Sequence, residues 1–163
     1  MKTFFILLLA VSFSACQKEL SFTVDPMMNT ELFKQFLTTD KKFRLVEFYS
    51  DMPIDFDVND SLSVKETDLW NHVLYYLKDD ENVFMQDGTL NILQNTETIP
   101  GDVSPLLVRS YSIQTVDNRV TFDFVDHNYQ PFRYFLKEKG EDYFIIYTER
   151  DKAKLYTKFV VIE

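Results

Sequence analysis

An acidic stretch between Asp55 and Glu66 is the part of this sequence whose residue types and spacing best match a binding chemistry. Its oxygen-bearing residues recur at the intervals of an EF-hand loop, in which carboxylates and carbonyl oxygens surround a calcium ion. Asp55, Asp57 and Asn59 would supply side-chain oxygens to the ion. Ser61 would supply its backbone carbonyl, and Glu66 a bidentate carboxylate. The stretch is therefore a candidate calcium site.

The same stretch has an interpretation without a metal. Asp60 stands where an EF-hand loop has a glycine for its sharp turn, and the residues before the loop favour a strand over a helix. Ser63 and Glu66 have the spacing of a capping box, in which each side chain accepts a backbone N–H at the start of a helix. A helix from this box to about Lys78 would bury one apolar face. That face comprises Leu69, Trp70, Val73, Leu74 and Leu77.

No pattern in the sequence indicates catalysis. His72 and His127 are the only histidines, and neither has another histidine or a cysteine at the short spacing of a zinc site. The Gly-x-Ser-x-Gly motif around the nucleophile of many serine hydrolases does not occur. Pairs of carboxylates are common simply because the chain is acidic. We therefore expect a protein that is not an enzyme and has no cofactor other than the candidate calcium ion.

The N-terminus has the parts of a secretory signal. A start containing Lys2 is followed by an apolar run over 4–11 and by mostly small residues over 12–15. The apolar run is far shorter than the ~20 residues that a membrane-spanning helix needs. Cys16, the only cysteine of the chain, follows directly.

This arrangement resembles a bacterial lipoprotein signal, in which small residues precede the modified cysteine. The resemblance implies that residues 1–15 are a signal peptide, that Cys16 is lipidated and acylated, for example with palmitate, and that 16–29 form a lipidated tether. Several acyl chains hold a protein stably at a membrane. Gln17-Lys18-Glu19 resembles the start of surface-exposed lipoproteins of Bacteroidetes, which implies an outer-membrane lipoprotein displayed on the cell surface. A secreted protein with an unmodified cysteine, or retention inside the envelope, is the alternative.

Composition limits the partners and the fold. The chain has 17 basic and 26 acidic residues and a net charge of −9. This charge argues against nucleic acid as a partner and against electrostatic docking on anionic lipid. Phe and Tyr are abundant, with 16 and 9 copies, so we expect a packed domain. Because the chain has one cysteine, no disulfide can form within it.

Residues 30–163 carry the patterns of a single domain. A short helix is expected over 30–38, because its apolar residues recur at helical spacing. Asp87-Gly88 lies between two alternating segments and predicts a hairpin, and Asp117-Asn118 predicts a second turn. The apolar helix face comprises Leu32, Phe33, Phe36 and Leu37. The expected strands are 42–50, 83–85, 90–92, 106–115, 119–125, 132–137, 142–149 and 155–162.

Eight sequential antiparallel strands with two short helices predict a mainly β fold, either an up-and-down barrel or a strongly curled sheet. Pairing of the first strand with the last would leave no free edge. The order of parts resembles that of the lipocalin-like lipoproteins of Bacteroidetes, and the resemblance rests on 43–49, 55–60, 67–69 and 82–90. It implies an eight-stranded antiparallel lipocalin-like barrel.

Two functions of different classes remain open. An eight-stranded barrel is wide enough to hold one small ligand. In that case the protein is a binding module for a small apolar ligand or a glycan. The many bulky Phe and Tyr side chains favour instead an interior filled by side chains. In that case the protein is a structural or accessory subunit that meets an envelope protein partner.

Overall fold

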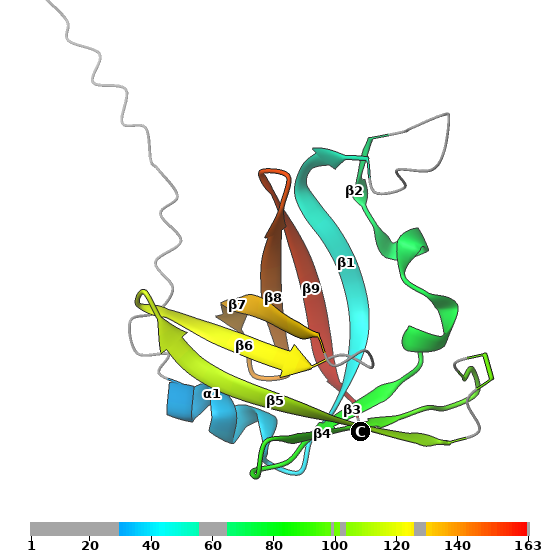
Figure 1. Ribbon diagram of the computed structural model, residues 1–163, viewed down its shortest axis with the longest axis vertical. Helices are drawn as coiled ribbons and strands as arrows, with labels where there is room; N and C mark the ends of the chain where they lie inside the picture. The colour runs from blue at the N-terminus through cyan, green and yellow to red at the C-terminus, as the bar shows by residue number, and fades with distance from the viewer. Residues whose placement is uncertain (1–29, 56–64, 99, 102–103, 126–129, 163) are drawn as a thin grey trace, which may run out of the picture.

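The computed structural model describes residues 30–55, 65–98, 100–101, 104–125 and 130–162. Within these residues eight strands form a closed antiparallel barrel, in which each strand pairs with the next (Figure 1). The predicted barrel is therefore confirmed. Its strands are β1 (Lys42–Ile54), β3 (Glu81–Phe84), β4 (Thr89–Leu93), β5 (Leu106–Val116), β6 (Arg119–Val125), β7 (Pro131–Lys139), β8 (Tyr143–Arg150) and β9 (Ala153–Ile162).

Two seams at β1 close the barrel, and they differ in length. On one side β1 pairs with β9 along Lys42–Ser50, which is the predicted pairing of first and last strands. On the other side a single pair within the described residues joins β1 to β3, with Phe43 opposite Asn82. Further along, β1 bends away and pairs with the short strand β2 (Glu66–Asp68) (Figure 1). The wall beside β3 is therefore completed by the segment that follows β2.

The helix α1 (Thr30–Leu37) lies across one end of the barrel (Figure 1). Its side chains of Phe33, Phe36 and Leu37 are buried, whereas Leu32 is half exposed. The predicted helix is thus confirmed, and three residues of its predicted apolar face supply the burial that holds it in place. In the part of the chain that the structure describes, no helix is long and apolar enough to cross a membrane.

The prediction of a second helix, ending near Lys78, is wrong. Glu66 begins β2, and two single turns of 3-10 helix follow, η1 (Trp70–His72) and η2 (Tyr75–Leu77). The described residues therefore contain one α-helix instead of the two expected. The apolar residues of the predicted stripe lie on different sides of this segment, since Leu69 is fully buried and Leu74 is 53% exposed.

Strand pairing explains why that helix does not form. The N–H of Leu69 donates to the carbonyl oxygen of Phe48 in β1, 2.9 Å away. The N–H of Trp70 donates to Oδ1 of Asp68 at 3.0 Å. These bonds engage backbone groups that a continuous helix would need for its own ladder. Ser63, the other half of the predicted capping box, lies outside the described residues.

The turns predicted from the sequence connect the strands as expected. Gly88 has φ +89° in the hairpin between β3 and β4, where Oδ1 of Asp87 accepts the N–H of Thr89 at 2.9 Å. Asp117 and Asn118 have φ of 50° and 58° between β5 and β6. A two-residue hairpin turn of type I′ requires positive φ at both central residues, and its twist matches that of the two strands that it connects.

Candidate functional site

A cavity of about 480 Å³ lies inside the barrel. Its volume falls in the range of roughly 300–1,000 Å³ that is usual for sites that bind small molecules. Every strand of the barrel contributes a lining side chain, and most of these side chains are apolar, as Leu90, Phe122 and Phe159 are. The expectation that Phe and Tyr side chains fill the interior is therefore wrong.

Aromatic side chains of α1 pack against aromatic side chains of the barrel at the end that this helix covers. Phe33 of α1 packs edge-to-face on Phe144, with ring centroids 5.5 Å apart, and Phe36 packs in the same way on Phe43 at 5.4 Å. Phe84 joins this cluster and, like Phe144, also lines the cavity. These two rings form the floor of the cavity, and the barrel beyond them is left unfilled by side chains.

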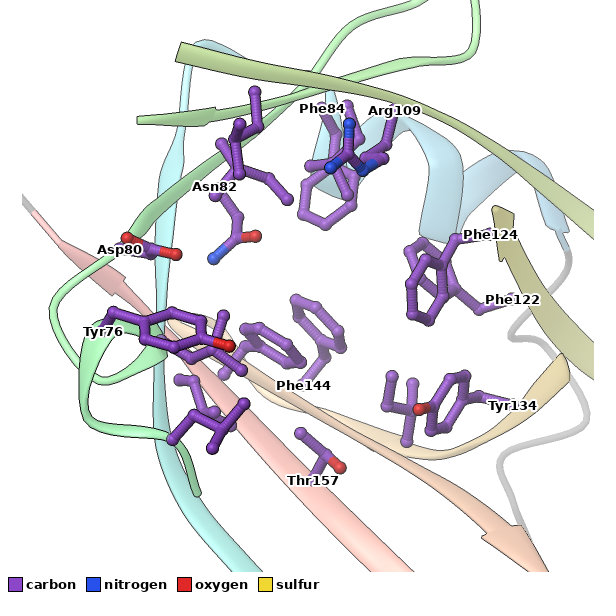
Figure 2. Close-up of a pocket in the computed structure, with 18 residues that line it drawn as sticks. Tyr76, Asp80, Asn82, Phe84, Arg109, Phe122, Phe124, Tyr134, Phe144 and Thr157 are labelled. Atoms are coloured by element: carbon purple, nitrogen blue, oxygen red, sulfur yellow. The ribbon is translucent and has the colours of Figure 1, made fainter. Parts of the chain in front are cut away.

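Polar side chains gather on one side of the cavity, next to the start of β3 (Figure 2). Alternate residues of a strand face the same way, and Asp80, Asn82 and Phe84 accordingly all line the cavity. The hydroxyl of Tyr76, at the centre of η2, points toward the same space. Nδ2 of Asn82 donates to the carbonyl oxygen of Phe43, 3.3 Å away, which ties this amide to the seam with β1.

Asp80 is the most unusual of these groups. The residue is only 2% exposed to solvent. Its Oδ1 atom has no hydrogen-bond partner among the described residues. Burial, together with the neighbouring negative charge of Asp79, raises the pKa of Asp80 from its usual value to about 6. At neutral pH the carboxyl is therefore mostly ionised, and one of its oxygens lacks a donor.

The neighbouring carboxylate of Asp79 has a clear structural role. Its Oδ2 accepts the backbone N–H of Thr96 at 2.9 Å and that of Glu97 at 3.2 Å. Its backbone carbonyl accepts a hydrogen bond from the side chain of Asn95. These bonds join the segment before β3 to the loop after β4, and so they hold the backbone that carries Asp80.

The other walls of the cavity carry polar groups that lie away from Asp80 (Figure 2). Arg109 enters from β5, and its Nη1 donates to the carbonyl oxygen of Val108 at 2.9 Å. Tyr134 of β7 and Thr157 of β9 place hydroxyl groups in the wall. Burial raises the pKa of the Tyr134 hydroxyl, so this group stays neutral and keeps its O–H as a possible hydrogen-bond donor for a ligand.

The segment between β2 and β3 forms the rim of the cavity. Leu74 and Leu77 line the cavity and yet are 53% and 37% exposed. The segment is anchored by the buried Leu69 and by a contact between the Glu66 carboxylate and Nε2 of His72. An apolar molecule at this rim would meet leucine side chains before it reaches the interior.

The structure places two of the five candidate calcium ligands. Asp55 follows β1, and Glu66 opposes Ile54 at the start of β2, where its carboxylate contacts His72. No group of three or more His, Cys, Asp or Glu that could hold a metal occurs among the described residues. Asp57, Asn59 and Ser61 lie outside these residues, as do Cys16 and His127. The calcium site and the lipidation therefore stay predictions.

No sequence pattern singled out Asp80, Asn82 or Arg109 as a site residue. Asp80, Asn82 and Phe84 alternate along the chain just ahead of the hairpin, and this alternation is the sequence signal for Asp80 and Asn82. The predicted strand 83–85 began too late to include these two residues. No protein-family model, curated protein or solved structure matches this chain.

Proposed function

We propose that this chain is a lipid-anchored cell-envelope lipoprotein whose barrel binds a small, largely apolar ligand without chemically changing it. The observation that carries the proposal is the cavity of about 480 Å³, to which every barrel strand contributes. Removal of apolar ligand surface from water contributes about 25 cal/mol per Å². Most of the side chains in the cavity wall are apolar, so a bound ligand would bury its apolar surface against them.

The chemistry of the walls favours an apolar ligand over a glycan. A glycan presents hydroxyl groups in all directions, and each one that is buried without a partner costs roughly 1–3 kcal/mol. Leu45, Ile92, Leu107 and Ile146 offer no hydrogen bonds from their side chains. The alternative of an accessory subunit rested on a barrel filled with side chains, and the cavity counts against that alternative.

The proposed anchor places the barrel where apolar molecules are concentrated. Cys16, acylated as its sequence context implies, would hold residues 30–162 next to the outer membrane through the tether 16–29. Metabolic labelling with a palmitate analogue tests this part of the proposal. Label is expected on the wild-type chain and not on Cys16→Ser, and an unlabelled wild-type chain would overturn the anchor. Protease treatment of intact cells tests surface display.

Two adjacent residues of β5 provide a matched test of the cavity. Leu107 lines the cavity, whereas Val108 is 55% exposed on the other face. Fluorescence titration of the full chain carrying Cys16→Ser would use N-phenyl-1-naphthylamine, an uncharged apolar probe. Leu107→Trp should weaken probe binding at least tenfold by filling the cavity, and Val108→Trp should leave it within about twofold. Equal binding by the two variants, with both folded by circular dichroism, would rule the cavity out as the site.

A further inference from the structure

We propose that the cavity selects apolar ligands that carry a protonated amine, and that Asp80 is the counter-ion of that amine. This inference rests on the proposed function, because it names the ligand class of the same cavity. It starts from a carboxylate that is buried in the wall and has an oxygen without a hydrogen-bond partner among the described residues.

Asp79 and Asp80 differ in where their carboxylates lie and in what those carboxylates are seen to bind. A carboxylate that shapes a loop accepts backbone N–H groups, and Asp79 accepts two of them. Oδ1 of Asp79 and Oδ1 of Asp80 both lack a hydrogen-bond partner among the described residues, but only Asp80 lines the cavity. A buried charge without a partner destabilises the fold. Such a cost at a cavity wall is expected where the missing partner belongs to a ligand.

The groups around Asp80 suit an ammonium ion. An ammonium group has three N–H donors and no acceptor. On this side of the cavity the Asp80 carboxylate, the Asn82 amide and the Tyr76 hydroxyl point toward a common space (Figure 2). Each of these side chains has an oxygen that accepts a hydrogen bond. The apolar body of the ligand would then extend over the rings of Phe122 and Phe124.

The other charged groups near Asp80 do not neutralise it. Asp79 is negative and raises the pKa of Asp80. Glu81 points to the other face of β3, where it pairs with Lys42 at 2.9 Å and with Arg44 at 3.5 Å. Arg109 lies on the adjoining wall from β5 (Figure 2). Tyr76 and Tyr134 carry the phenol groups of the cavity lining, and burial raises the pKa of Tyr134 above its usual value.

The charge of Asp80 sets the expected pH dependence. An amine binds the ionised carboxylate, and burial and Asp79 place the pKa of this group at about 6. Affinity for an amine should therefore be constant above pH 7 and should fall about tenfold for each pH unit below 6. An alcohol of the same length binds either form of the carboxyl, so its affinity should change little over the same range.

The test uses three probes that share one apolar chain: octylamine, octanol and octanoate. Isothermal titration with the full 163-residue chain carrying Cys16→Ser should give the order octylamine, octanol, octanoate, with at least tenfold between the first two at pH 7.5. Asp80→Asn should abolish the preference for the amine and its pH dependence, while octanol binding stays within about threefold. Asp79→Asn is the matched control. It should keep the preference and move the pH midpoint downward, since it removes a negative neighbour.

The outcomes separate the two proposals. Octylamine that binds no better than octanol, or a preference that survives in Asp80→Asn, overturns the amine specificity. The proposed function would stand in either case if Leu107→Trp still blocks the three probes. Failure of all three probes and of N-phenyl-1-naphthylamine to bind would overturn both proposals.

Discussion

The side-chain amide of Asn82 donates a hydrogen bond to the carbonyl oxygen of Phe43 across 3.3 Å, at the pair where β1 meets β3. On its other side β1 is held by β9 over Lys42–Ser50. The single pair at β3 is therefore the weaker of the two seams. The same side chain that strengthens it also lines the cavity.

Removal of this hydrogen bond should loosen the seam. Asn82→Ala is expected to lower the free energy of unfolding by about 1 kcal/mol, the usual net value of such a bond. Urea denaturation measures the change, and hydrogen exchange should show faster exchange in β1 and β3 than in β8 and β9. Asn91→Ala on β4, whose side chain has no comparable bond within the described structure, is the control. Equal losses for the two variants would contradict the role of Asn82.

The buried charge of Asp80 should make the protein less stable at neutral pH than in mild acid. Because its pKa is raised to about 6 from an ordinary 3.8, the folded state binds the proton more tightly than the unfolded state. The carboxyl thus favours folding most below pH 4, and this contribution is lost as pH rises through about 6. The free energy of unfolding of Asp80→Asn should exceed that of the wild-type chain by about 1–2 kcal/mol at pH 7.5 and by little at pH 4. A variant that is less stable at pH 7.5 in urea denaturation would contradict this account.

Two adjacent residues of β8 separate stability from ligand binding. Ile146 lines the cavity, whereas Tyr147 lies on the outer face, where its ring centroid is 5.4 Å from that of Phe135 and 5.7 Å from that of Tyr156. Tyr147→Ala should cost about 3 kcal/mol, as expected for a buried ring, and leave the affinity for N-phenyl-1-naphthylamine unchanged. Ile146→Ala should lower the free energy of unfolding by about as much, and it should also change the affinity for N-phenyl-1-naphthylamine. A shift of more than threefold in the folded Tyr147→Ala protein would show that the outer row of rings affects the cavity.

Two glycines at positive φ allow strain and crowding to be distinguished. Gly88 has φ +89°, and a Cβ atom added there would lie 3.1 Å from the carbonyl oxygen of Tyr111. Gly101 has φ +85°, and an added Cβ would meet nothing within 4 Å. Gly101→Ala should cost about 1 kcal/mol from backbone strain alone. Gly88→Ala should cost more, because β5 must also move, and thermal unfolding of the two variants measures the difference.

Local patterns were sufficient to predict α1, the hairpins and the order of the strands. Two hairpins have their own signals in adjacent residues, Asp87-Gly88 and Asp117-Asn118, and apolar and polar residues alternate in the strands beside them. The pairing of β1 with β9 follows once eight such strands must close without a free edge. The predicted helix up to Lys78 failed because its competitor, the edge of β1, is remote in the sequence.

The residues of this chain by themselves predicted a run of antiparallel strands that forms either a barrel or a strongly curled sheet, since turn geometry and side-chain alternation act between near neighbours. Only the tertiary structure decided that the barrel is closed, that its interior is open and that Asp80 is the acidic residue buried at its wall, among the residues that the structure describes. Whether a volume is filled depends on where rings from α1, β1, β3 and β8 meet. The burial of one carboxylate depends on which strands surround it, and neither relation is contained in any short stretch of sequence.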